Sequence, residues 1–462
     1  MRKLRSVVPA IGLLLAPCLS FSVLVFASES GDAARHHAHP PASSKPDAQH
    51  EMHGPMQGPM EGMRGAMVMR ADSFTEQILN HSTSGTSAEP NSTPTPMLMT
   101  PRGAWTLMFH GVGFVNDIQQ SGPRGRAKLF GVGWIMPMAQ RQLGPGTLTL
   151  RAMLSPEPAT VTGRRFPELL QQGETAFGNP ITDGQHPHDL FMELAAIYDL
   201  KAGENTLVSF YGAAMGDPAL GPTAYPHRAS ASEDPLATLG HHLQDSSHIV
   251  SDVLTVGLAY KLARIEFSGF HGREPDENRW NIDAGRLDSW STRLTVNPAQ
   301  NWSAQYSIGF LHSPEGQNPL ENTLRETASL MYNRPLSHGN WASTLIWGRN
   351  RTQASGEVFN SYLAESTLGF RDRNHVWGRI ENVDRTNELL LGGKPEPPGF
   401  QEHFLARVQA YTAGYDRDFW VVPHVATALG AQVTLYSTPA SLVSLYGSHP
   451  RGIVFFLRLK PR

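Results

Sequence analysis

The sequence predicts an all-β chain that forms an outer-membrane antiparallel up-and-down β-barrel of about 16 strands (14 to 18). From Trp105 to Lys460 it divides into short segments in which apolar and polar residues alternate. The connectors between these segments are alternately very short and long, and charged residues lie deep inside many segments. This rhythm of short segments and unequal connectors is typical of a barrel that crosses a membrane.

The clearest segment runs from Trp302 to Phe310. Its apolar face is Trp302, Ala304, Tyr306, Ile308 and Phe310, and the residues between them are small or polar. Only a strand has this period of two. In a barrel of this size the apolar face contacts lipid, and small polar residues line the lumen.

Charges on the opposite face favour a membrane barrel over a large soluble all-β protein, which is the alternative. They are expected to point into the lumen: Glu193, Glu266, Arg293, Arg325, Glu365, Arg379, Glu381, Arg407 and Arg458. Aromatic residues near segment ends suit interfacial girdles, although aromatics also favour strands in general. Those residues are Trp105, Trp134, Tyr198, Trp290, Trp302, Tyr332, Trp341, Trp377 and Trp420.

The sixteen expected strands can be placed one by one. They cover residues 104–116, 127–137, 147–154, 188–200, 206–215, 250–262, 264–271, 286–297, 301–311, 323–334, 340–350, 357–372, 375–386, 403–416, 424–437 and 451–460. Every junction from an even to an odd strand is tight, as at Gly144-Pro145-Gly146, which suits periplasmic hairpins. The long junctions at 155–187, 216–249, 272–285 and 387–402 suit external loops. An even number of strands places both termini in the periplasm.

The segment before the barrel divides into two parts. Residues 1–27 are expected to be a secretory signal peptide, because Arg2, Lys3 and Arg5 precede an apolar run that ends near Ala27; a retained anchor is the alternative. Residues 28–100 are rich in Pro, Ser, Gly, His and Met and predict a largely disordered periplasmic arm, with one short helix from Ser73 to Asn80. The barrel then occupies residues 101–462, in the outer membrane of a Gram-negative bacterium.

Composition excludes several other classes of protein. No later stretch has the eighteen or more apolar residues of a spanning helix. The only cysteine is Cys18, inside the expected signal peptide, so disulfides and thiolate metal sites are not expected. The net charge of −3 gives no reason to expect nucleic acid as a partner.

The arm carries the first candidate metal site. Its ligands would be imidazoles and thioethers, which together suit cuprous copper best because soft ligands select soft ions. The residues are His36, His37, His39, His50, Met52, His53, Met56, Met60, Met63 and Met67. Methionines three or four residues apart on a flexible chain can wrap an ion; a low-complexity tail without a ligand is the alternative.

This organisation resembles the copper-resistance outer-membrane proteins of the B type, which join a Met- and His-rich N-terminal segment to a β-barrel. The resemblance rests on that organisation and on residues 36 to 69. The rest of the chain, with the run Asp183-Gly-Gln-His186-Pro-His188-Asp189-Leu190, looks like uncharacterised outer-membrane barrels that accompany heavy-metal efflux systems. The resemblance implies metal tolerance and a periplasmic metal-efflux component as partner, without implying a mechanism.

The second candidate metal site lies in two long connectors. His186 and His188 are separated by one residue, so on an extended chain they point the same way and can share an ion; Asp189 follows them. His241, His242 and His248, with Asp245, lie in the next long loop. If that loop folds inward, both groups meet at the external mouth, where zinc or cupric copper suits imidazole and carboxylate ligands. Solvated loop histidines are the alternative.

The sequence does not indicate an enzyme. Asp245, Ser246, Ser247 and His248 supply the residue types of a hydrolase, but adjacent positions on one segment seldom form a triad. No phosphate-binding loop or zinc-protease motif occurs, and no organic cofactor is expected.

We therefore expect an outer-membrane barrel that contacts lipid and metal ions and contributes to the binding, tolerance or passage of copper or another heavy metal. Paired Arg and Glu residues would line its lumen or lock across it. The alternatives are a general porin-like channel for small solutes and a structural protein of the cell surface.

Overall fold

The wall of the structure is a closed antiparallel barrel. The structure is a computed structural model that describes residues 65–422 and 424–461, all within one compact unit that begins at Met60. The wall strands are β3 (Trp105–Gln120), β4 (Ala127–Leu143), β5 (Gly146–Leu154), β10 (Phe191–Gly203), β11 (Thr206–Gly216), β12 (Val250–Tyr260), β13 (Ala263–His271), β14 (Ser289–Ala299), β15 (Trp302–Leu311), β16 (Thr323–Leu336), β17 (Gly339–Thr352), β18 (Val358–Phe370), β19 (Asn374–Thr386), β20 (Phe404–Val422), β21 (Val425–Ser437) and β22 (Arg451–Pro461).

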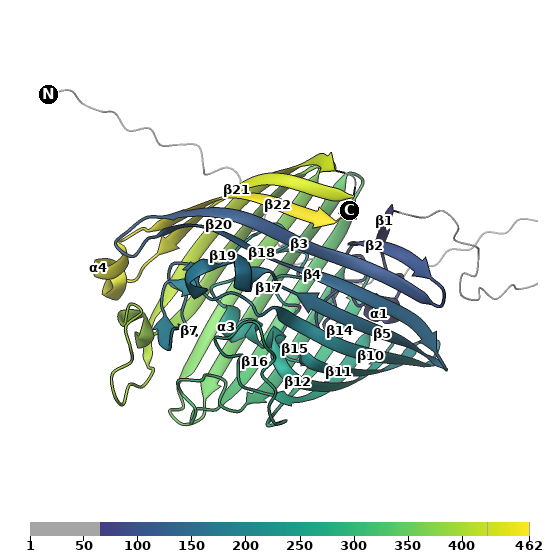
Figure 1. The fold of residues 1–462 in the computed structure, drawn as a ribbon, viewed down its shortest axis with the longest axis horizontal. Helices are drawn as coiled ribbons and strands as arrows, with labels where there is room; N and C mark the ends of the chain where they lie inside the picture. Colours follow the sequence, from purple (N-terminus) through teal and green to yellow (C-terminus); the bar gives the residue numbers. More distant parts are fainter. Residues whose placement is uncertain (1–64, 423, 462) are drawn as a thin grey trace, which may run out of the picture. The chain divides into compact units, whose positions relative to one another are not determined.

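Each wall strand pairs with the next, and the last pairs with the first. β22 lies antiparallel to β3 with Arg458 opposite Phe114, which closes the barrel. The sheet has 18 strands, of which β1 and β2 lie outside this ring, so 16 form the wall. The predicted fold and strand number are confirmed, and every predicted strand overlaps a wall strand (Figure 1).

Connector length separates the two ends of the barrel. Short turns join β4 to β5, β10 to β11 and the following alternate pairs at one end, which we call the turn end. The long connectors lie at the other, the loop end. Two of them, residues 155–190 and 217–249, are called here the first and second inward loops. The first contains α2 (Glu157–Thr160) and two small antiparallel strand pairs, β6 (Phe166–Pro167) with β9 (Gly184–Gln185) and β7 (Glu174–Ala176) with β8 (Asn179–Ile181).

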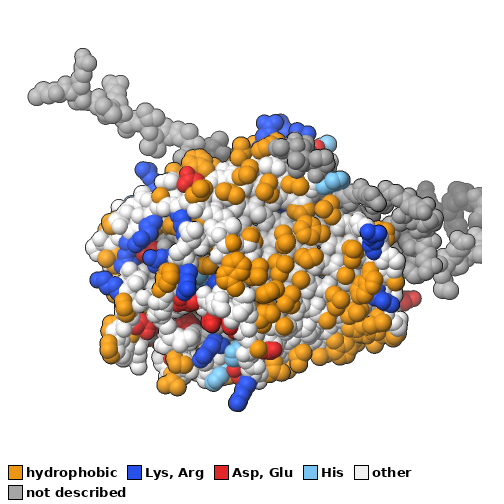
Figure 2. Space-filling view, viewed as in Figure 1, with side chains coloured by type: hydrophobic (Ala, Val, Ile, Leu, Met, Phe, Trp, Pro, Cys, Tyr) orange, Lys and Arg blue, Asp and Glu red, His pale blue; other side chains and the backbone are white. Residues whose placement is uncertain are grey.

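The wall is apolar outside and polar inside. On β15, Trp302 and Tyr306 are exposed, whereas Ser303 and Ser307 are buried. The same alternation runs around the barrel, and hydrophobic side chains cover a broad field of the wall in Figure 2. A surface of this kind is stable against lipid, because the outer face is mainly apolar and the backbone hydrogen bonds are made between strands. None of the described helices is long and apolar enough to cross a membrane.

Two details of the inward and outward assignment were wrong. Arg407 is exposed on the outer face, where it pairs with Asp384 at 2.7 Å. Its neighbours Ala406 and Val408 point inward instead, because the inward loops bring apolar side chains, including Leu169 and Leu239, into the lumen beside them. Trp134 and Trp377, expected at the membrane interface, are also buried.

Part of the arm expected to be disordered is ordered in the structure. β1 (Gly65–Met69) pairs with β2 (Thr95–Arg102), and β2 pairs with the first residues of β3. Between them, α1 (Phe74–Leu79) begins where the Ser73 side chain accepts a hydrogen bond from the Glu76 amide, which confirms the predicted helix. Residues 81–94 then run through the lumen; we call them the luminal segment.

Side chains of the wall hold the luminal segment in place. Arg151 donates to the carbonyl oxygens of His81, Thr83 and Gly85, and Asn333 donates to that of Ser92. Gly85 has a φ of 57°, and a Cβ there would lie 2.4 Å from the Asp217 carbonyl oxygen. The arm could not be expected to order by itself, since its partners are polar wall residues that come together only in the closed barrel.

Ion pairs also hold the second inward loop inside the barrel. Arg228 is completely buried and bonds Glu365 of β18 at 2.6 Å and Asp245 of its own loop at 3.0 Å. Arg379 of β19 bonds Asp234 at 3.0 Å, and Arg458 of β22 bonds Glu233 at 2.8 Å. The predicted lumen charges therefore lock loop to wall. A further short helix, α4 (Val443–Tyr446), lies at the loop end.

Candidate functional site

The two inward loops bring the predicted loop histidines together. His186, His188 and Asp189 end the first inward loop, and His241, His242 and His248 lie in the second, in α3 (His241–Gln244) and the 3-10 turn that follows it. All six line one small cavity. The loop folds inward as the sequence analysis required; metal binding by these residues stays a prediction.

Three of these histidines share one arrangement. The ring of His248 lies 5.4 Å from that of His188 and 5.1 Å from that of His241, centroid to centroid. The Nδ1 atom of each ring makes a hydrogen bond to an acceptor. His188 bonds the Glu157 carboxylate at 3.0 Å, His241 bonds the Asp245 carboxylate at 2.7 Å, and His248 bonds the Asp245 carbonyl oxygen at 2.8 Å. Nε2 of His248 is buried without a partner. Acceptors at Nδ1 orient metal-binding imidazoles in many metal sites.

The charges around these rings set their protonation. Burial lowers the pKa of His248 well below its usual value, and the neighbouring rings of His241 and His188 lower it further. Burial also lowers the pKa of His241. For His188 burial acts in the same direction, but Glu157 outweighs it and the pKa rises. At neutral pH His241 and His248 are therefore neutral, which is the form that binds metal.

The other members of the predicted set have other partners. Hydrogen bonds to Glu174 and Glu274 outweigh burial and raise the pKa of His242 to about 10, so His242 is a cation. Asp189 pairs with Arg279 at 3.3 Å. We therefore place His188, His241 and His248 at the centre of the candidate site and the remaining three at its edge.

The arm residues of the predicted set cannot be placed in the same way. His36 to Met63 lie outside the described residues, and so does any site formed by them. Met67 lies in β1, where its backbone pairs with Met97 of β2.

Among the described residues, a different group has three ligand atoms within 4.8 Å of one another, namely Glu233, His375 and Asp416. Arg458 already binds this group, at 2.8 Å from Glu233 and 3.0 Å from Asp416. Its guanidinium supplies the positive charge that a metal ion would bring. The nitrogens of the three central histidines lie further apart, so binding one ion requires their rings to draw together.

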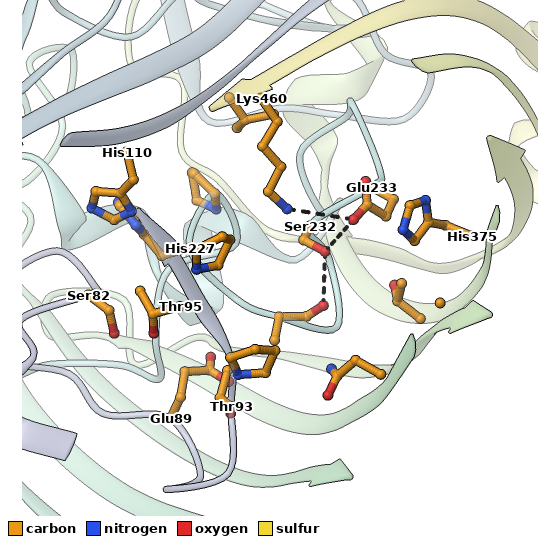
Figure 3. A pocket seen from close by; sticks show the side chains of 18 of the residues that line it. Ser82, Glu89, Thr93, Thr95, His110, His227, Ser232, Glu233, His375 and Lys460 are labelled. Atoms are coloured by element: carbon orange, nitrogen blue, oxygen red, sulfur yellow. Dashed lines mark hydrogen bonds and ion pairs between the residues drawn. The ribbon is translucent and has the colours of Figure 1, made fainter. Parts of the chain in front are cut away.

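The histidine cavity belongs to a row of cavities. At the loop end it shares His186, Glu274 and Arg279 with an outer vestibule of about 280 Å³. On its inner side it shares His188 with a narrow cavity. That cavity in turn shares Trp134 and Pro226 with an inner cavity of about 290 Å³, which residues of the turn end help to line (Figure 3).

The outer vestibule is mainly acidic. Eight carboxylates line it, together with Arg273, Arg279 and His186: Glu174, Glu274, Asp276, Glu277, Glu315, Glu388, Glu396 and Glu402. Burial and neighbouring carboxylates raise the pKa of Glu315 to about 8. Burial raises the pKa of Glu402 to about 6. A cation that binds between crowded carboxyl groups of this kind stabilises their ionised form.

Sequence reasoning missed one further cluster. Seven methionines form most of a buried group on β2 and the adjoining wall strands: Met97, Met108, Met136, Met138, Met153, Met192 and Met215. A signal was present in the sequence, since Met108 and His110 share one strand face and Met136 and Met138 share another.

No protein-family model and no curated protein matches the chain. Among solved structures, it is similar to an anion-selective porin from Comamonas acidovorans, with 11% identity over 77% of this chain and 99% of that one and a TM-score of 0.46. OmpF of Salmonella typhi in complex with daunomycin is 9% identical over 79% of this chain and 100% of that one, with a TM-score of 0.46. OprB of Pseudomonas putida is 9% identical over 78% of this chain and 94% of that one, with a TM-score of 0.46. Likenesses this distant carry no argument about what this chain binds, and its resemblance to copper-resistance proteins stays a prediction.

Proposed function

We propose that the chain is a porin-like outer-membrane channel that passes small cations, transition-metal ions among them, through a constricted lumen. The row of four cavities that share lining residues from the outer vestibule to the inner cavity carries this proposal. The long loops then face the outside of the cell and the turn end faces the periplasm, as in barrels of this type.

The charges along the row favour cations. Eight carboxylates against two arginines surround the vestibule. A pore mouth lined by one sign of charge raises the local concentration of the opposite ion. Beyond it, the three central histidines offer imidazole nitrogens, of which those of His241 and His248 are neutral, and imidazole suits zinc or cupric copper rather than potassium.

The lumen is constricted by its own chain, and this favours small ions over larger solutes. The histidine cavity measures about 30 Å³ and the next one about 40 Å³, which is room for one or two water-sized particles. A sugar or peptide cannot pass such spaces unless the inward loops move. The channel we propose is therefore a porin-like channel restricted to small cations, and the copper or other heavy metal expected from the sequence is one of the ions it would pass.

Selectivity in planar bilayers tests the proposal. With a potassium chloride gradient across the bilayer, we expect a reversal potential that reports cation preference, and we expect micromolar zinc added on the loop side to reduce the current. Above about pH 8, where Glu315 is ionised, the double variant Glu274→Gln/Glu315→Gln should shift the reversal potential toward anions. Glu204→Gln, in the exposed turn after β10, is the matched control and should leave it unchanged. Anion preference, or no current from a correctly folded barrel, would overturn the proposal.

A further inference from the structure

The methionine cluster differs from an ordinary core in its position. Methionine commonly fills gaps in apolar cores. Elsewhere the inner face of this wall carries mainly serine, threonine and charged side chains, such as Ser209, Thr255 and Arg293. On the stretch from β2 to β11, seven of the chain's 16 methionines gather within one buried group of nine residues. A simple need for apolar volume would be met by leucine and valine, as it is on the opposite side of the lumen.

Two histidines contact the sulfur atoms of this cluster. Nε2 of His110, on β3, lies 3.0 Å from Sδ of Met136. Nε2 of His227, in the second inward loop, lies 3.1 Å from Sδ of Met153. The wall and the loop thus each bring one imidazole against one thioether.

The two imidazoles also lie close to each other. Their ring centroids are 6.3 Å apart, and the indole of Trp134 lies 5.1 Å from one and 4.2 Å from the other. Two imidazoles that bind one ion at about 2.0–2.1 Å have centroids at most about 6.4 Å apart. The observed spacing is within that limit.

This pair of rings is accessible from the inner cavity. His110, Trp134 and His227 all line that cavity, and Figure 3 shows the two histidines together on one of its walls, with Glu233 and His375 across from them. The sulfur atoms lie behind the rings, in the buried cluster. An ion that reaches the cavity therefore meets imidazole nitrogen first and thioether sulfur second.

We propose that His110, His227, Met136 and Met153 form a binding site for a soft monovalent cation, cuprous copper or silver, at the inner end of the lumen. Thioether ligands select soft ions, whereas imidazole binds copper as well as zinc, so the mixed set favours cuprous copper or silver over zinc, magnesium or calcium. The site carries no carboxylate, so a single positive charge is better matched to it than a double one. This inference deepens the proposed function, since it names a cargo for the channel, but binding is measured without transport.

Silver titration of the full chain in detergent tests the site, because silver is a soft ion that needs no reductant. Met136→Leu/Met153→Leu is the key variant, since such swaps keep side-chain volume and usually cost less than about 1.5 kcal/mol. Met331→Leu, a buried methionine of β16 outside the cluster, is the matched control. We expect the double variant to bind one silver ion fewer per chain than the control, while any sites in the arm remain.

A local signal separates this site from the arm. Silver bound between the two rings lies beside Trp134 and should quench its fluorescence, so the quenched fraction should fall in Trp134→Phe and be lost in the double variant. His227→Gln, a change in the inward loop, provides a second variant if the wall variant does not fold, and should weaken this silver step by about 100-fold or more, since even outer-shell partners account for 10–100-fold. Unchanged silver stoichiometry and quenching in these variants, or equal loss of zinc binding, would overturn the inference. Silver binding without cation current would instead overturn only the proposed function.

Discussion

The luminal segment gives the sharpest prediction about how the lumen is kept narrow. Arg151 and Glu193 are only 3% and 0% exposed, and they form an ion pair at 2.7 Å. Arg151 also donates to three carbonyl oxygens of the luminal segment, and Glu193 accepts from the Gly85 amide at 3.0 Å. Arg151→Gln removes the charge that binds the three carbonyl oxygens and the Glu193 carboxylate, which in turn binds the Gly85 amide. We therefore expect the luminal segment to dissociate from the wall while the barrel itself stays folded.

The size of the effect follows from burial. Removing one partner of a buried ion pair typically costs about 3–5 kcal/mol, because the other charge is left without compensation. At about 1.4 kcal/mol per factor of ten, the ratio of seated to released segment falls by roughly two to three and a half orders of magnitude. Gly85→Ala should act in the same direction, since the added Cβ has no room beside Asp217.

Hydrogen exchange with peptide resolution measures this release. Amides of residues 81–94 should exchange faster in Arg151→Gln, while those of β12 to β22 stay protected, and the bilayer current should increase. Arg349→Gln is the control, because Arg349 pairs with Glu326 on the partly exposed outer face at 3.3 Å. If residues 81–94 exchange as slowly in Arg151→Gln as in the parent, the reasoning about these bonds is wrong.

Three further predictions concern the loops and the vestibule. Leu169→Ala should cost about 2–5 kcal/mol in the apolar cluster that seats the first inward loop, seen as faster proteolysis within 155–190, whereas Leu320→Ala, at a 91% exposed site, should change nothing. Cation selectivity should increase from pH 6 to pH 9, because a raised pKa keeps Glu315 protonated until about pH 8; a flat reversal potential over that range would contradict this. Asp245→Asn weakens the acceptor for His241 and should lower zinc affinity by about 10–100-fold in a competition titration, while unaltered affinity would remove the three central histidines from the site.

The barrel could be predicted from sequence because its signals are local. Alternation at Trp302 to Phe310 needs only the period of a strand, and tight turns such as Gly144-Pro145 mark their own positions. Arg407 was misplaced because alternation assumes a polar lumen. Apolar loops fill the lumen beside Val408, and the sequence of β20 alone does not show them.

The candidate sites were predictable only in part. His186 and His188 face one cavity because two residues of a strand-like run share a face, and this much is local. Their meeting with His241 and His248 depended on the second inward loop, whose anchors Arg228, Asp234 and Glu233 bond strands far along the chain. The contact of His227 with Met153 is equally non-local, at a sequence separation of 74. The residue pattern within a single segment cannot predict such a contact.

The luminal segment also constrains the order in which the molecule assembles. It comes before all of the wall strands in the chain, yet Ser92 bonds Asn333 across a separation of 241 residues, and its neighbours bond wall residues from Arg151 onward. Contacts over such separations form late, because the entropy of closing the intervening loop must be met first. Residues 81–94 must therefore already lie within the curving sheet when β22 reaches β3, because afterwards the inward loops fill the interior. Closure of the ring and capture of residues 81–94 are thus coupled steps in the assembly of the barrel.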